Sequence, residues 1–219
     1  MLYLFDIDGT LVDTGGAGMA ALKEATYEVF GNEGPALDLA GSTDLGIVAN
    51  IHAHFGIEPT LERVGIYFEV YVSRLNWNLI HGQFPGHVLP GVSEILTKLS
   101  GRPNSTVGLL TGNTAQGAAA KMHHFGLAEH FPFGAYGSDH ADRNRLGPIA
   151  LKRAATHAGK FFTAAETLVI GDTPKDIACA HAIGARCLAV ATGQFSKAEL
   201  ESYGADHAVD SLKDALAWV

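Results

Sequence analysis

Short hydrophobic runs bounded by turn residues recur along the chain and predict buried β-strands. They span residues 2–5, 107–110, 132–135, 168–170, 187–190 and 207–209. Around the later runs, apolar residues recur with the spacing of helices at residues 92–99, 115–125, 148–158, 174–183, 197–203 and 212–218. This alternation of strands and helices predicts an α/β fold with a doubly wound parallel sheet, a Rossmann-like core.

One interval breaks the alternation. Residues 17–30, 44–55 and 61–80 all favour helices, and no convincing strand occurs between residues 14 and 86. Gly15 and Gly16 precede the interval and Pro85 and Gly86 follow it, and such residues punctuate chains and serve as hinges. The sequence therefore predicts an α/β catalytic core of residues 1–14 and 86–219 and an inserted all-helical domain of residues 15–85.

The composition and charge of the chain limit the classes of partner that it could bind. Hydrophobic residues make up 47% of the 219 positions and charged residues 17%, which is typical of a compact globular protein. The net charge is -8 and no run of Lys or Arg occurs, so we expect no nucleic acid and no anionic membrane as partner. If a chain this acidic binds an anionic small molecule, it must attract it locally, through a metal ion and a few donors.

The sequence also suggests a location. No stretch approaches 18 apolar residues, and the apolar start is cut by Asp6 without a basic leader or a cleavage site. Cys179 and Cys187 lack metal-ligand spacing and are expected as small buried hydrophobic residues. We therefore expect a cytoplasmic protein, whose oligomeric state a single sequence does not give.

Carboxylates follow the first predicted strand, at the edge where parallel sheets bind ligands. Asp6 and Asp8 lie two residues apart, and Gly9 lets the chain turn sharply behind them. One carboxylate can attack a phosphate ester and form a covalent intermediate. The other can protonate the leaving group and then deprotonate the attacking water. The pair therefore indicates hydrolysis in two displacements.

Residues that could bind phosphate or a metal ion also follow two further predicted strands. Thr111, Gly112 and Asn113 follow the second core strand and offer a hydroxyl, a bare amide and a side-chain amide to phosphate oxygens. Asp172 and Asp176 follow the fourth core strand, around a predicted helix start. Together with Asp6 they supply the hard oxygen ligands that Mg²⁺ prefers, which predicts this cofactor.

A basic residue should neutralise the phosphate, and the segment 142–145 before the helix of Lys152 is the richest candidate. Arginine binds phosphate with two hydrogen bonds, so Arg143 and Arg145 are the main candidates, with Arg143 preferred because its loop position gives it more reach. Lys152, inside the predicted helix, is the third choice.

At these residues the chain resembles a known family. Asp6-Ile7-Asp8-Gly9-Thr10-Leu11-Val12-Asp13 resembles the first motif of the haloacid dehalogenase superfamily phosphatases, including phosphoglycolate phosphatase-like members. The segments 111–113 and 171–176 resemble the second and fourth motifs, so the resemblance covers nearly the whole chain. The helical insertion resembles the family's cap of the first type.

The resemblance implies roles for these residues. Asp6 would form an aspartyl-phosphate, Asp8 would be the general acid and base, and Thr111 would hold the phosphoryl group. Mg²⁺ would lie between Asp6, the Asp8 main-chain carbonyl and Asp172, with Asp176 in a supporting position. The third motif departs from the family's Lys-Pro-x-Pro, since this chain has Arg145-Leu146-Gly147-Pro148.

The substrate is less defined. The expected partner is a small-molecule phosphate ester, either phosphoglycolate-like or a sugar phosphate. Ser42 and Thr43 lie in a polar turn of the insertion, where the resemblance places a substrate-facing loop. Two alternatives remain: a phosphomutase of the same superfamily, and a non-enzymatic phosphoacceptor module. The insertion and the Asp6–Asp8 pair favour the hydrolase.

Overall fold

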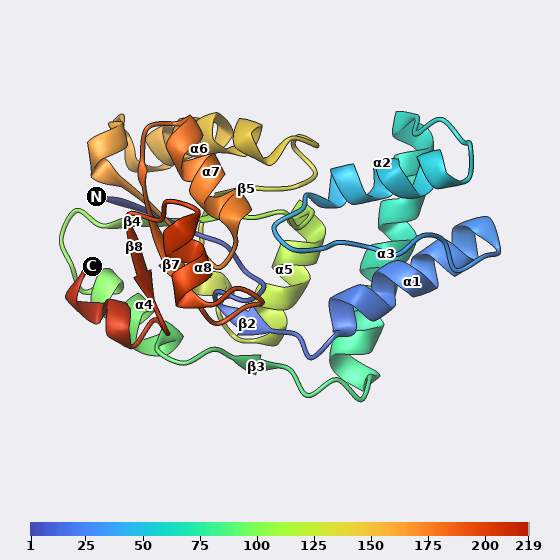
Figure 1. Cartoon of the computed structure of the whole chain (residues 1–219), viewed down its shortest axis with the longest axis horizontal. Helices are drawn as coiled ribbons and strands as arrows, with labels where there is room; N and C mark the ends of the chain where they lie inside the picture. Colours follow the sequence, from blue (N-terminus) through green and yellow to red (C-terminus); the bar gives the residue numbers. More distant parts are fainter. Residues whose placement is uncertain (219) are drawn as a thin grey trace.

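A computed structural model describes residues 1–218 of the chain. Its centre is a six-stranded parallel sheet in the order β5-β4-β1-β6-β7-β8 (Figure 1). The strands are β1 (Leu2–Phe5), β4 (Thr106–Leu110), β5 (Gly134–Ala135), β6 (Thr167–Gly171), β7 (Arg186–Val190) and β8 (His207–Val209). The predicted doubly wound α/β fold is confirmed.

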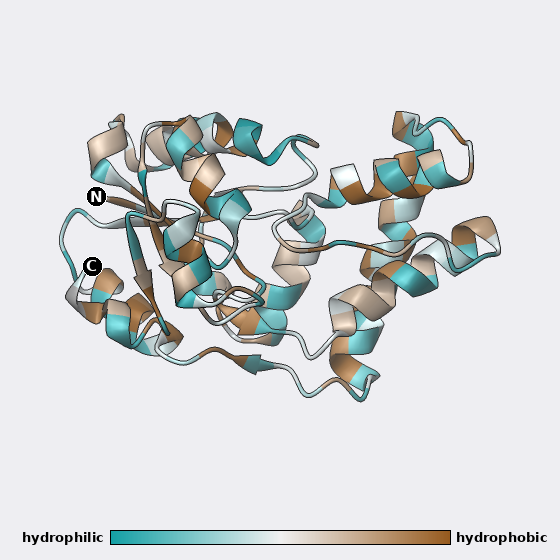
Figure 2. Cartoon of the chain, in the orientation of Figure 1, coloured by the Kyte–Doolittle hydropathy of each residue, from teal (hydrophilic) through white to brown (hydrophobic). Residues whose placement is uncertain are grey.

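Alternating side chains of the central strand enter two separate cores, because successive residues of a strand face opposite sides. Tyr3 and Phe5 pack with helices α4 (Val92–Ser100) and α5 (Ala115–His124) on one face. Leu2 and Leu4 pack on the other face, with the helices α6 (Leu146–Ala158), α7 (Pro174–Ala182) and α8 (Lys197–Ser202). Figure 2 shows the resulting apolar strands between more hydrophilic outer helix faces. The central strands are therefore buried on both sides.

The insertion is helical, as the sequence predicted. It contains α1 (Ala17–Phe30), α2 (Asp44–His54) and α3 (Leu61–His81), which extend from one end of the molecule (Figure 1). These helices share a hydrophobic cluster of their own, which includes Leu22, Ile51 and Tyr67. A core separate from those of the sheet is typical of a distinct domain. The exact boundaries at residues 14/15 and 85/86 stay a prediction.

Two short strands went unpredicted. Strands β2 (Val12–Asp13) and β3 (His87–Val88) pair antiparallel where the chain leaves and re-enters the core. Gly86 lies beside this ladder, and a Cβ there would come within 2.9 Å of the Asp13 carbonyl oxygen. The pairing joins segments far apart in sequence, so no local sequence pattern predicts it. It ties the two connections to the insertion together.

Smaller differences occur at segment ends. The predicted helix 212–218 is a 3₁₀ turn at Asp214–Ala217, and the predicted strand 132–135 is only Gly134–Ala135. Pro132 lacks an N–H for the ladder, which explains the shortened strand. Cys179 and Cys187 are free and buried, as expected.

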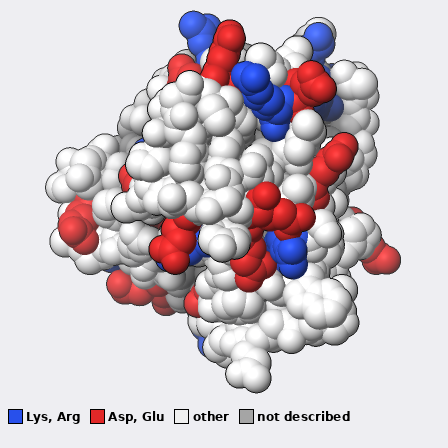
Figure 3. Space-filling model, turned by 90° about the vertical axis from the view of Figure 1, so that its right-hand side faces the viewer, with Lys and Arg blue, Asp and Glu red and all other residues white. Residues whose placement is uncertain are grey.

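Surface charge agrees with the sequence. Lys and Arg are scattered among Asp and Glu on the face at the end of the insertion, without a basic stripe (Figure 3). Among residues 1–218, no helix combines the length and the apolar character that a membrane span requires.

Candidate active site

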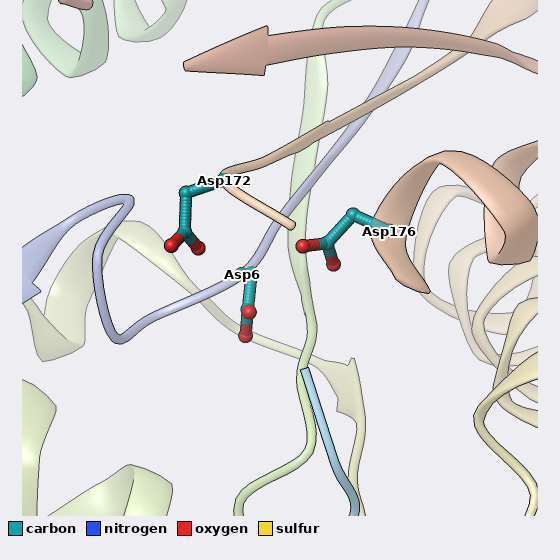
Figure 4. A group of neighbouring side chains, drawn as sticks. All are labelled: Asp6, Asp172 and Asp176. Atoms are coloured by element: carbon teal, nitrogen blue, oxygen red, sulfur yellow. The ribbon is translucent and has the colours of Figure 1, made fainter. Parts of the chain in front are cut away.

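Three buried carboxylates converge at one edge of the sheet (Figure 4). Asp6 follows β1, Asp172 follows β6, and Asp176 lies in the first turn of α7. Strands β1 and β6 are parallel neighbours, so their carboxyl ends meet. One oxygen from each carboxylate lies within 4.8 Å of the others. This brings together three of the four predicted metal ligands.

The local sequence holds this cluster in place. Thr173 caps α7 and Pro174 opens it, both favoured positions for these residue types. Asp176 Oδ2 accepts hydrogen bonds from the Thr173 amide at 3.0 Å and its hydroxyl at 2.7 Å. Asp172 Oδ1 accepts one from the Thr10 hydroxyl at 3.2 Å. The carboxylates are therefore fixed before any ligand binds.

Arg143 is the cation of this cluster. It lies in a 3₁₀ turn, Arg143–Arg145, that leads into α6 and is 6% exposed. Its Nη2 lies 3.0 Å from Asp6 Oδ2 and pairs with Asp176. Arg145 and Lys152 are exposed. Of the three candidates for the basic residue, the geometry brings Arg143 to Asp6, although its catalytic role stays a prediction.

Three carboxylates against one guanidinium leave negative charge in excess. Burial raises the pKa of Asp6 to about 6, although Arg143 lowers it. Burial, reinforced by the charges of Asp176 and Asp6, also raises the pKa of Asp172 well above its usual value. Burial lowers the pKa of Arg143, but Asp176 and Asp6 outweigh this effect and raise it. The excess of buried carboxylate oxygen fits a hard divalent cation.

Asp8 lies apart from the cluster and faces a lysine that sequence reasoning missed. Lys121, on α5, is 3% exposed, and its Nζ donates to Asp8 Oδ1 at 2.7 Å and Oδ2 at 2.6 Å. It also donates to Asn113 Oδ1 at 2.6 Å. Asn113 Nδ2 completes the group by donating to Asp8 Oδ2 at 2.8 Å. The Asp8 carboxylate is therefore held by two donors, Lys121 and Asn113.

The three residues after β4, Thr111, Gly112 and Asn113, make different contacts in the site. Thr111 is fully buried, and its hydrogen bond lowers the pKa of Asp6. Asn113 Nδ2 donates to Thr111 Oγ1 at 2.9 Å, which links Asp8 to this hydroxyl. Gly112 permits close approach, because a Cβ there would lie 1.9 Å from the Ser42 carbonyl oxygen. Glycine at this position lets the insertion contact the core backbone.

The insertion contacts the core through residues 41–45. Asp44 N donates to the Gly112 carbonyl at 2.7 Å, and Asp44 Oδ2 accepts from Thr114 N at 2.7 Å. Thr43 caps α2, and its hydroxyl donates to the Ala141 carbonyl at 2.6 Å. The Ser42 hydroxyl accepts from Lys175 at 2.7 Å. These bonds hold the insertion over the strand ends.

A cavity of about 650 Å³ lies between the strand ends and the insertion. Of the predicted site residues, its lining includes Asp6, Asp8, Ser42, Gly112, Asn113, Arg143 and Asp172. Thr111, Asp176, Thr43 and Arg145 are outside the lining. Asp176 is itself a member of the cluster, and Thr111 hydrogen-bonds Asp6. The Thr43 hydroxyl is engaged with the core backbone. Substrate binding by Thr43 and Arg145 stays a prediction that this geometry does not support.

Lys121 is a buried polar residue of the site that the sequence reasoning missed. Lys121 shares a helix face with the buried Gly117 and Ala118, at spacings of four and three residues. A lysine on the buried face of an amphipathic helix was an available signal, since buried lysines need a partner.

Known proteins of one family resemble this chain in sequence and in structure. The haloacid dehalogenase-like hydrolase family matches residues 3–190. A phosphoglycolate phosphatase of Pseudomonas fluorescens (strain Pf0-1) is 26% identical over 88% of this chain and 70% of its own. A hydrolase from Pseudomonas syringae has a similar structure, with a TM-score of 0.73, 23% identity and coverage of 98% and 95%.

A second solved structure carries a ligand. A mutant of CbbY from Rhodobacter sphaeroides, in complex with xylulose-(1,5)bisphosphate, has a TM-score of 0.75 and 20% identity. The similarity covers 96% of this chain and 94% of that one. At these identities the solved structures support the fold, including its helical insertion.

Proposed function

Because the chain belongs to the haloacid dehalogenase-like hydrolase family, we propose that it is a magnesium-dependent phosphohydrolase of a small phosphate monoester. The phosphatase class agrees with the relatives named phosphoglycolate phosphatase. The observation that carries the finer proposal is the position of Asp6. Its carboxylate lines the cavity, pairs with Arg143 and lies among the other buried acids.

Asp6 is the nucleophile in this proposal. Its carboxylate oxygen attacks the phosphorus, the bond from phosphorus to the ester oxygen breaks, and an aspartyl-phosphate forms on Asp6. Arg143 holds the Asp6 carboxylate in place and offsets negative charge on the phosphoryl group. The Gly112 amide lines the same cavity and is the proposed donor to a phosphate oxygen, because Asn113 Nδ2 already donates to Asp8 and Thr111.

Asp8 moves the protons. It gives one to the departing ester oxygen and later removes one from the water that attacks the aspartyl-phosphate. That second attack breaks the bond between phosphorus and Asp6 and releases inorganic phosphate. Lys121 and Asn113 hold the Asp8 carboxylate at a fixed place in the cavity lining, which this role requires.

The metal site is proposed at Asp6 and Asp172, with the main-chain carbonyl of Asp8, while Asp176 supports the cluster through Arg143 and Thr173. Mg²⁺ bound there supplies positive charge against the phosphoryl oxygens. The fit rests on the excess of buried carboxylates over cations in the cluster. The sequence predicted all four residues for this site.

The helical insertion acts as a cap in this proposal. It covers the cavity and touches the core through Ser42, Thr43 and Asp44, so its closure would exclude water from the first displacement. The paired strands β2 and β3 join it to the core and are the proposed hinge. Residues 15–85 remain the proposed extent of this domain.

The test is phosphate release from a panel of small phosphate esters, with magnesium and with EDTA. The wild type, Asp6→Asn and the control Asp210→Asn are compared, since Asp210 is an exposed acid outside the site. We expect magnesium-dependent turnover in the wild type and the control, and its loss in Asp6→Asn. Acid quenching should trap a labelled phosphoryl group on the wild-type protein that hydroxylamine releases.

Each outcome of this experiment tests a different part of the proposed function. Activity of Asp6→Asn near that of the wild type would show that Asp6 is not the nucleophile. Turnover unaffected by EDTA would contradict the metal requirement. Absence of phosphate release from every ester would contradict the hydrolase and favour a mutase or a phosphoacceptor module.

A further inference from the structure

The wall of the cavity that the insertion forms is largely apolar, with Asp38, Ser42 and Asp44 as its polar members. Its apolar side chains come from all three helices and from the segment between α1 and α2, namely Met19, Leu22, Leu37, Leu39, Ile47 and Tyr71. The proposed phosphate end of the cavity is at Asp6 and Arg143, which the core contributes. The alcohol part of a bound phosphate ester would therefore contact this wall, because the phosphate must face Asp6.

Positive charge in the cavity is already engaged. Among the described residues that line it, Lys121 and Arg143 are the basic ones. Arg143 pairs with Asp6 and Asp176, and Lys121 is bonded to Asp8 and Asn113. Both positive charges are therefore paired with carboxylates, and no further cation among the described lining residues faces a second anionic group on the substrate.

Negative charge is plentiful on the same side. Asp13, Asp38 and Asp44 line the cavity in addition to the acids near Asp6. Lys175, outside the lining, lies 3.9 Å from Asp38 and donates to the Ser42 hydroxyl. An anionic leaving group would thus meet an apolar wall and several carboxylates, which oppose its burial.

We propose that the substrate is a phosphate monoester of an apolar alcohol that carries no second anionic group. This inference rests on the proposed hydrolase function and names its substrate class. It separates this chain from enzymes that act on phosphoglycolate or on bisphosphates, because those substrates bring a second negative charge. An uncharged apolar alcohol replaces water against the wall and leaves the pairs of Lys121 and Arg143 intact.

The experiment compares esters matched in shape. Isobutyl phosphate and phosphoglycolate have the same heavy-atom skeleton, but only phosphoglycolate carries a carboxylate. Phenyl phosphate and 4-carboxyphenyl phosphate form a second pair, in which the charged member has a carboxylate added to the ring. Glycerol phosphate is a comparator whose alcohol is polar and uncharged. We expect kcat/KM to be at least about tenfold higher for the uncharged apolar member of each pair, a ratio typical of one mismatched group.

A variant tests the charge argument from the other side. Met19→Lys places a cation in the apolar wall, and Met19→Gln is its uncharged control of similar length. We expect Met19→Lys to raise the ratio of kcat/KM for 4-carboxyphenyl phosphate over phenyl phosphate by about tenfold, and Met19→Gln to leave this ratio unchanged. A circular dichroism melt checks that both variants are folded.

The outcomes separate this inference from the function. Equal or faster turnover of phosphoglycolate or 4-carboxyphenyl phosphate by the wild type would overturn the substrate class and leave the hydrolase standing. A kcat/KM for glycerol phosphate equal to that of isobutyl phosphate would overturn the apolar requirement. Failure of the wild type to release phosphate from all of these esters, and from p-nitrophenyl phosphate, would instead overturn the proposed function.

Discussion

Replacing Arg143 with methionine should strongly destabilise the protein, because it removes the positive charge between two buried carboxylates. Arg143 Nη2 lies 3.0 Å from Asp6 Oδ2. At an effective dielectric constant of about 20, that pair alone attracts by roughly 5 kcal/mol. Breaking a buried ion pair from one side typically costs about 3–5 kcal/mol, since the remaining charge is uncompensated.

The measurement is urea unfolding in EDTA, followed by circular dichroism, for the wild type and Arg143→Met. We expect the free energy of unfolding to fall by about 3–5 kcal/mol and Tm by roughly 10 °C for a chain of this size. Arg145→Met is the matched control, because Arg145 lies in the same 3₁₀ turn but is exposed. The control should stay within about 0.5 kcal/mol of the wild type.

A loss below about 1 kcal/mol in Arg143→Met would refute the reasoning, since that is the size expected of a surface pair. It would mean that the carboxylates bind protons or rearrange without cost. A comparable loss in Arg145→Met would also refute it, by tracing the effect to the turn and not to the buried charge.

Three further predictions address Lys121, Asp44 and Asp172. Lys121→Met should lower kcat about 100-fold for alkyl phosphates, because Asp8 loses the lysine that positions its carboxylate. The loss should be much smaller for p-nitrophenyl phosphate, whose leaving group needs little protonation. Equal losses for the two substrates would contradict this role of Lys121. Burial raises the pKa of Asp44 from 3.8 to about 6, so its stability contribution is complete below pH 3.8 and lost as pH rises through 6. Asp44→Asn should therefore gain up to about 3 kcal/mol over the wild type between pH 4 and 7 in unfolding titrations, and a pH-independent difference would contradict this. Asp172→Ala should raise the magnesium concentration needed for half-maximal phosphate release, and an unchanged requirement would exclude Asp172 as a ligand.

Local sequence patterns were sufficient to predict much of the fold. The apolar run of β1 and the glycine and proline punctuation around the insertion act over a few residues, so they are visible without a structure. The same holds for Asp6, Asp172 and Asp176, because the ends of neighbouring parallel strands always meet at one edge of the sheet. Their convergence in the structure follows from that rule.

Other features depend on contacts between distant segments, which no local pattern specifies. The sequence allowed Arg143, Arg145 and Lys152 as the basic residue, and only the direction of the 3₁₀ turn before α6 brings Arg143 to Asp6. The pairing of β2 with β3 joins residues on opposite sides of the insertion.

The sequence by itself determined the chemistry of the strand ends, whereas tertiary structure decided the surroundings of that chemistry. Lys121 meets Asp8 across 113 residues, and the apolar wall of the cavity is assembled from three helices and a connecting segment. Burial and charge at such places depend on the packing of whole elements, because each element contributes only one or two side chains. Asp6 could therefore be proposed as the nucleophile from the combined sequence motifs, but the environment of the leaving group required the folded chain.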